Sequence, residues 1–210
     1  MSLARAVAAP KRLSDADRRA HIVAAAERAF VRNGFHATTM QHVAEEAGMS
    51  AGNLYRYFPS KEALVEGLCA ADQVQSAEIF AQMIQGGDLR TAMTAALRDH
   101  LLCSPPEKSR MIVEVWAEAG RNPRVAALTR ALDEDVLLGI ERLIEAAKSS
   151  GVASLSLDAR FAARVIFTLV AGLFKRLALE PAFDVKAEAA MAIGVFQALF
   201  AGAISPAEEI

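Results

Sequence analysis

The 210-residue sequence has little of what marks secreted, metal-binding or membrane proteins. It contains only two cysteines, Cys69 and Cys103, whose separation fits no zinc-binding spacing. A disulfide framework and a zinc module are therefore excluded, and both cysteines are interpreted as buried thiols in a reducing compartment. No apolar run of 18 residues lacks charge, which excludes a membrane span, and the first residues are too weakly apolar for a signal peptide. We expect a cytoplasmic protein.

Net charge is also small, at −2, and would not by itself suggest a nucleic-acid partner. The charge is unevenly distributed, however. Residues 1–61 carry nine Lys or Arg and five Asp or Glu, a balance of +4, whereas residues 62–210 carry 14 and 20, a balance of −6. A basic N-terminal part on an acidic remainder is the pattern expected of a DNA reader joined to a second domain. The hydrophobic content of 53%, rich in alanine and leucine, favours a helical protein with a substantial core.

The most informative stretch is TTMQHVAEEAGMSAGNLYRYFPSK, residues 38–61. It predicts two short helices, at about 40–47 and 51–58, joined by a tight turn. Gly48 lies where the first helix must end, because glycine adopts a left-handed backbone without steric cost. Ser50 is then the N-cap of the second helix.

Spacing within this stretch is more specific than any single residue. Thr38 and Thr39 are candidate caps for the first helix. Ala44 lies four residues before the turn glycine, where a small side chain lets two helices cross closely. Leu54 lies six residues after it, where an apolar side chain fills the crossing. This is the sequence form of a helix-turn-helix, whose second helix enters the major groove of DNA.

The segment AGMSAGNLYRYFPSKEAL resembles the DNA-binding motif of the tetracycline-repressor (TetR) family of bacterial transcription regulators. The resemblance covers about residues 15 to 65, and the rest of the chain matches the family only in length and helical pattern. Tyr57 departs from the histidine that the family often has there. The resemblance implies a ligand-responsive, sequence-specific repressor, released from a palindromic operator by a small, largely apolar effector.

Helical periodicity predicts an all-α fold of about nine helices, with no strand and no internal repeat. A helix over about 15–33 supports the motif, and the later helices are expected over about 60–85, 88–103, 107–119, 123–149, 157–179 and 185–203. The chain divides into a basic arm, a three-helix DNA-binding head and a body for ligand binding and dimerisation, at residues 1–13, 14–59 and 60–205. The arm is either a disordered tail or a contact to DNA.

Side chains expected to contact DNA lie at the start of the second motif helix and beside it. Small residues there let the free amides of the helix approach phosphates. Asn53 suits a base edge, adenine best, and Arg56 suits a guanine or a phosphate. The resemblance implies contacts to the phosphate backbone of DNA for the threonine, tyrosine and lysine positions. The full set is Thr39, Gln41, Ser50, Ala51, Gly52, Asn53, Tyr55, Arg56, Tyr57 and Lys61.

Several of these positions have a purely structural alternative. Tyr55 or Tyr57 would pack on the first helix. Lys61 would be a solvated surface lysine, and Arg56 would pair with a glutamate of the first motif helix.

One head has too small a footprint for tight, specific binding, so we expect a homodimer that reads a palindrome. Its heads would be spaced by about one helical turn of DNA, ~34–36 Å, or a multiple. The last two helices are the expected interface, packing on their copies as a four-helix bundle. The predicted interface residues, which would otherwise be intramolecular core, are Phe161, Val165, Leu169, Leu173, Ile193, Phe196, Gln197 and Phe200.

The resemblance also implies a cavity for an unknown small molecule among the middle helices. Methionine and aromatic residues suit an adaptable apolar pocket, although their helical spacing is also that of an ordinary core. The predicted set is Phe80, Met83, His100, Cys103, Met111, Trp116, Phe167 and Phe174. Bound ligand would favour a conformation whose two heads no longer fit adjacent grooves.

Two other functions stay open. Glu114 and Glu118, with His100 upstream, suggest the carboxylate metal site of an all-helical enzyme. No Glu-x-x-His pair accompanies them, so no catalytic residue, metal or cofactor is predicted. The second is an architectural or activating DNA-binding protein without a ligand. The weak positive charge opposes an architectural role, because non-specific binding needs many phosphate contacts.

Overall fold

The computed structural model describes residues 14–102 and 105–206, so the predicted arm at residues 1–13 and Cys103 lie outside it. Within that part the chain forms nine α-helices and no strand, which confirms the predicted fold class. The helices are α1 Asp15–Asn33, α2 Met40–Glu46, α3 Ala51–Tyr57, α4 Lys61–Gln85, α5 Leu89–Leu102, α6 Pro106–Ala119, α7 Pro123–Ser149, α8 Ala159–Leu179 and α9 Val185–Phe200.

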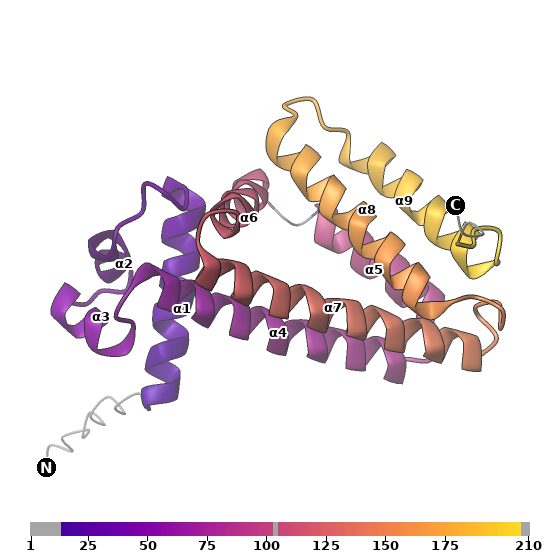
Figure 1. Cartoon of the computed structure of the whole chain (residues 1–210), viewed down its shortest axis with the longest axis horizontal. Helices are drawn as coiled ribbons and strands as arrows, with labels where there is room; N and C mark the ends of the chain where they lie inside the picture. The colour runs from indigo at the N-terminus through magenta and orange to yellow at the C-terminus, as the bar shows by residue number, and fades with distance from the viewer. Residues whose placement is uncertain (1–13, 103–104, 207–210) are drawn as a thin grey trace, which may run out of the picture.

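The helices form an elongated molecule with α1, α2 and α3 at one end (Figure 1). The two longest helices, α4 and α7, run side by side away from this end and make the most extensive helix pair. The helix α8 packs on both α6 and α7, and α5 packs on α9. We call residues 14–59 the head and the remaining described residues the body. Because α4 starts directly after the head, packs on α1 and crosses the body, it links the two mechanically.

Side-chain caps fix where several helices begin. Ser14 and Ser60 accept hydrogen bonds from first-turn amides of α1 and α4. Asn122 caps α7, which has proline in its first turn. Asp158 caps α8, so this helix begins two residues later than the expected 157. The reason is that Leu157 is buried in the loop before the helix.

The core of the head continues into the body. Its fully buried residues include Ile22 and Phe30 of α1 and Leu54 of α3. Met111 of α6 and Val125 of α7 belong to the same cluster. The first turns of α4 join it as well, through Ala63, Leu64, Val65 and Cys69. The predicted domain boundary at residue 60 therefore does not separate two independent cores.

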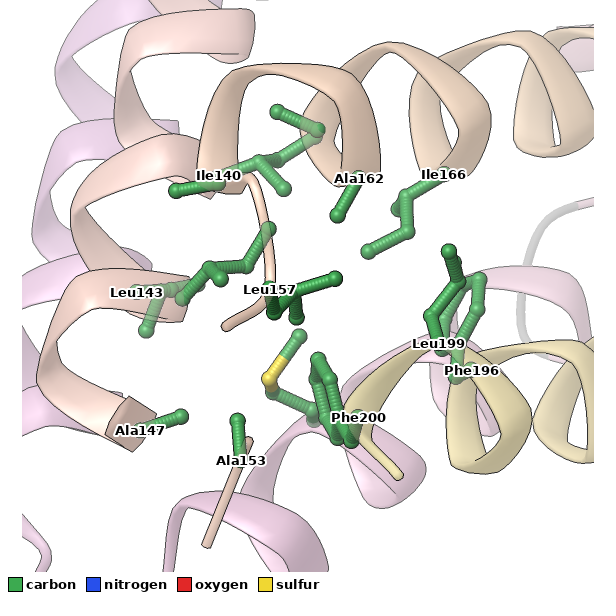
Figure 2. Packing of buried hydrophobic residues seen from close by; sticks show 14 of the residues in the cluster. Ile140, Leu143, Ala147, Ala153, Leu157, Ala162, Ile166, Phe196, Leu199 and Phe200 are labelled. Carbon is green, nitrogen blue, oxygen red and sulfur yellow. The ribbon is translucent and has the colours of Figure 1, made fainter. Parts of the chain in front are cut away.

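A second core fills the body, between α7, α8 and α9. Figure 2 shows Ile140 and Leu143 of α7 facing Ile166 of α8, with Leu199 and Phe200 of α9 closing the cluster. Alanines of α7 and α8 are fully buried among them, so the helices approach closely. Among the described residues of the body, the only buried polar side chains are those of Ser109 and Thr129.

The contact between α4 and α7 depends on a glycine. A Cβ atom on Gly139 would lie 2.2 Å from two ring carbons of Phe80, far inside van der Waals contact. Gly139 thus makes room on α7 for this ring of α4. Farther along α4, the apolar side chains of Val74 and Ile79 are 60% and 40% exposed.

Candidate nucleic-acid interface

The predicted helix-turn-helix is present with the expected turn. Gly48 has a φ of 65°, the left-handed conformation that favours glycine. Ala44 and Leu54 are completely buried where α2 and α3 cross. Ser50 accepts a hydrogen bond from the amide of Asn53 at 3.3 Å and so caps α3. Each of these local features was predicted from the sequence, and together they fix the angle between α2 and α3.

The two threonines before α2 have different roles. Thr39 is the N-cap and accepts a hydrogen bond from the amide of His42 at 3.2 Å. Thr38, also predicted as a possible cap, is 2% exposed, and its hydroxyl donates to the carbonyls of Gly34 and Ala29. Its hydroxyl is used inside the head, so the prediction of a capping role for Thr38 is wrong.

The outer side of α3 is open to solvent. Tyr55 is 50% exposed, and Ser50, Gly52 and Arg56 are exposed as well. Asn53 is half-buried, as is Ala51 at the start of the helix. A Cβ atom on Gly52 would meet no other atom within 4 Å, so no contact within the described residues requires a glycine there. The second residue of α3 therefore presents no side chain to solvent.

Beside α3, Thr39 and Gln41 are both exposed on α2 and its cap. The side-chain amide of Gln41 donates to the carboxylate of Glu45 at 2.9 Å. This i,i+4 contact on the surface of the helix is weak and is readily exchanged for an external partner. Both side chains remain accessible for the predicted backbone contacts.

Lys61 makes contacts inside the chain that the sequence did not reveal, whereas Tyr57 contacts α1, the helix named in its structural alternative. The Lys61 ammonium donates to the carbonyls of His36 at 3.3 Å and Thr38 at 3.0 Å, and lies 4.3 Å from the ring centre of Phe35. Burial lowers the pKa of Lys61. Tyr57 is half-buried, and its carbonyl accepts from Arg19 at 2.9 Å. The phosphate contacts expected of Lys61 and Tyr57 stay predictions.

The head is held together by charged residues of α1 that sequence reasoning missed. Arg28 and Arg32, one turn apart, each bond the Glu46 carboxylate of α2 at 2.8 Å. The hydrogen bond from Arg28, with that from Arg32, lowers the pKa of Glu46. Glu46 was a candidate partner of Arg56, whereas the structure pairs it with α1. The i,i+4 spacing of the two arginines was the available signal.

The predicted effector residues do not form one described cavity. Phe80, Met83 and Phe167 pack against the body core, whereas Met111 belongs to the head core. Phe174 is buried and Trp116 is half-buried. Cys103 and the side chain of His100 lie outside the described residues.

Two surface hollows of about 350 and 420 Å³ are both lined in part by α1 of the head. None of the predicted effector residues lines either hollow. The effector site stays a prediction.

The predicted interface residues fall into two groups. Leu173, Phe196 and Phe200 are at most 7% exposed within a single chain, so they have almost no surface left for a second copy. This corrects the expectation that these three side chains pack across an interface, since they fill the body core instead. Gln197 is exposed, and the remaining positions, Phe161, Val165, Leu169 and Ile193, are half-buried.

The acidic pair considered as a metal site is engaged elsewhere. The Glu114 carboxylate accepts from the backbone amides of Phe35 and His36, and Glu118 bonds Arg121 at 3.0 Å. Across residues 14–102 and 105–206, no three His, Cys, Asp or Glu side chains are grouped as a metal ion would need. No helix in the same ranges is long and apolar enough to cross a membrane.

Comparison with known protein families gives two matches. Residues 22–68 match the family model described as bacterial regulatory proteins, tetR family. Residues 87–195 match the model described as BetI-type transcriptional repressor, C-terminal.

Curated relatives include the HTH-type transcriptional regulator UidR of Escherichia coli (strain K12). It is 28% identical over 177 residues, which cover 84% of this chain and 88% of UidR. The uncharacterized HTH-type transcriptional regulator YfiR of Bacillus subtilis (strain 168) is 34% identical over 113 residues, covering 50% of this chain and 54% of YfiR.

Solved structures with the same fold include Salmonella enterica GusR, with a TM-score of 0.73 and 25% identity over 90% of this chain and 99% of GusR. A structure of FadR from Bacillus subtilis in complex with stearoyl-CoA has a TM-score of 0.68 and 20% identity, over 87% of this chain and 98% of that one.

Proposed function

Because the chain belongs to the TetR family of bacterial transcriptional regulators, we propose that it is a ligand-responsive repressor that binds a palindromic operator as a homodimer. The start of α3 enters the major groove, while Thr39 and Gln41 contact phosphates beside it. The division into a reading head at 14–59 and a sensing and pairing body at 60–205 is part of this proposal. The protein acts in the cytoplasm, where the operator is.

The observation that carries the proposal is the exposed start of α3. Ser50, Gly52 and Arg56 face solvent, and the space around Gly52 is empty. A major groove about 12 Å wide admits an α-helix, and the missing side chain at Gly52 lets the start of α3 approach the DNA backbone closely. Arg56, one turn along, then reaches a guanine edge or a phosphate.

Pairing through α8 and α9 is supported by two further glycines. Gly172 of α8 and Gly194 of α9 lie within helices, and a Cβ atom on either would meet nothing within 4 Å. Leu179 and Met191 on the same helices are 61% and 45% exposed. Glycines at a helix surface permit close approach of another helix, and exposed apolar side chains gain free energy when a second copy covers them.

Two observations bear on the effector and on the sign of regulation. The described interior of the body is almost entirely apolar, with Ser109 and Thr129 its only buried polar side chains, which favours a largely apolar effector. The match over residues 87–195 is to the C-terminal part of a transcriptional repressor, which favours repression over activation.

Selection of bound fragments from a random DNA pool tests the function. The expected result is a palindrome whose half-sites are spaced by one helical turn or a multiple. Sedimentation at micromolar concentration should show a dimer, and compounds that release the recovered palindrome identify the effector. Binding with a steep salt dependence but no preferred sequence would instead indicate an architectural protein.

A further inference from the structure

The loop of residues 34–38, between α1 and α2, is held from two sides by different helices. From α6, the Glu114 carboxylate accepts from the backbone amides of Phe35 and His36. From the first residue of α4, the Lys61 ammonium donates to the carbonyls of His36 at 3.3 Å and Thr38 at 3.0 Å. The amides of the loop are thus bonded to an anion and its carbonyls to a cation.

Gly34 makes this approach possible. Its φ of 80° is in the region that favours glycine, and a Cβ atom there would lie 3.1 and 3.2 Å from the two Glu114 carboxylate oxygens. A larger residue would strain the backbone and push the carboxylate off the amides. The partners Phe35 and Glu114 are 79 residues apart in sequence, so this contact joins the head directly to α6.

Further charges surround the same loop. Arg121, just beyond α6, donates to the ring Nε2 of His36 at 3.0 Å and to the Glu118 carboxylate. The charges of Glu118, Glu62 and Glu114 favour the protonated form of Lys61, opposing the effect of its burial. Lys61 therefore lies among carboxylates that oppose, without cancelling, the lowering of its pKa by burial.

From this geometry we propose that Glu114 and Lys61 form a clamp that sets the position of α2 and α3 relative to the body. The clamped loop is followed directly by Thr39, the N-cap of α2. Displacement of α6 relative to α4 therefore moves α2 and α3. Lys61 is then a positioning residue rather than a phosphate contact. This inference rests on the proposed DNA-binding function.

Long-range electrostatics alone predict that removal of the Glu114 charge strengthens DNA binding, the opposite of what loss of the clamp predicts. Removing a negative charge from a DNA-binding protein strengthens its attraction to phosphates, whereas loss of the clamp misplaces the reading helices and weakens binding. For Lys61, a phosphate contact would contribute about 0.9 to the slope of log K against log salt concentration. A positioning residue leaves that slope unchanged.

The test measures operator affinity over a salt series for Glu114→Ala, Glu114→Gln and Lys61→Met in the full chain. We expect Glu114→Ala to lose about tenfold in affinity, a size typical of coupling between sites. Glu114→Gln keeps one carbonyl acceptor and should lose less. Glu107→Ala is the matched control, because it makes the same charge change in the first turn of α6, away from the loop. Lys61→Met should lower affinity without changing the salt slope.

Hydrogen exchange of the Phe35 and His36 amides provides a readout that does not involve DNA. Glu114→Ala should accelerate exchange at both amides, while far-UV circular dichroism confirms that the variant is folded. Unchanged exchange together with unchanged operator affinity would overturn the clamp. A salt slope reduced by about 0.9 in Lys61→Met would overturn its positioning role. If the wild-type chain bound no DNA, the proposed function would fail, and amide exchange would still decide whether the clamp exists.

Discussion

The head and the body are built by different means. In the head, particular polar groups find particular partners: buried Thr38 bonds two carbonyls, and Glu46 is shared by Arg28 and Arg32. The body core consists of leucine, isoleucine, phenylalanine and many alanines, with two buried polar side chains among the described residues. Residue identity therefore specifies the head, whereas size and helical spacing specify the body. Many sequences satisfy the second requirement, so the short motif that can be recognised by its spacing lies in the head, although residues 87–195 of the body also match a family model.

The two regions nevertheless share a core, and the largest expected effect tests that continuity. Leu54→Ala removes a fully buried side chain of α3 and should lower the free energy of unfolding by about 3 kcal/mol. Because Met111 and Val125 belong to the same cluster, head and body should unfold together. Urea unfolding at fixed protein concentration, followed by circular dichroism and by Trp116 fluorescence, measures both. Two separated transitions would show that the head is independent.

In the body, a substitution that disturbs packing at Gly139 should lower the free energy of unfolding more than loss of a surface polar contact. Gly139→Ala places a methyl group against the Phe80 ring and should destabilise by about 2 kcal/mol. Adding Phe80→Leu should restore part of the loss, since the smaller side chain makes room. Gly52→Ala is the control in open space and should cause no destabilisation. Urea midpoints for the single and double variants check this, and strictly additive losses would exclude the clash.

The smallest expected effect is the dependence of fold stability on pH through Glu46. The pKa of Glu46 lies below its usual value, so its bonds to Arg28 and Arg32 stabilise the fold above about pH 4.5 and are lost as the pH falls further. Glu46→Gln should thus be less stable than the wild type at pH 6, with the difference narrowing below pH 4.

Glu180→Gln in the body is the comparison for this effect. Arg176 lowers the pKa of Glu180 too, but that pair is local to one helix end. Thermal unfolding between pH 3 and pH 7 should show a smaller change for Glu180→Gln. An equal or larger change for Glu180→Gln would mean that the bonds of Glu46 to Arg28 and Arg32 stabilise the head no more than a local ion pair stabilises the body.

Features set by neighbours in sequence were predictable. Gly48, Ser50 and Ser60 act through their own turn, and helix bounds follow from periodicity to within a few residues. Contacts over long separations were not. The bond between Glu114 and the Phe35 amide spans 79 residues, and nothing in the local sequence distinguishes that glutamate from a solvated one.

The same limit applies to the apolar residues of the body. Phe196 and Phe200 have the spacing of an interface stripe, yet both are buried within one chain. Helical periodicity shows that a face is apolar but not which helix covers it. Lys61 follows the motif directly, as a phosphate contact would, but its ammonium donates to carbonyls of the loop at residues 34–38.

The proposed DNA-binding function depends most on the exposed face of α3. Its most direct test is the operator affinity of a Tyr55→Ala, Arg56→Ala double variant, with the fold and dimer content first matched to the wild type. Two lost contacts of about 1–3 kcal/mol each predict a loss of at least about thirtyfold for the selected palindrome. Affinity equal to that of the wild type would contradict the placement of this face against DNA.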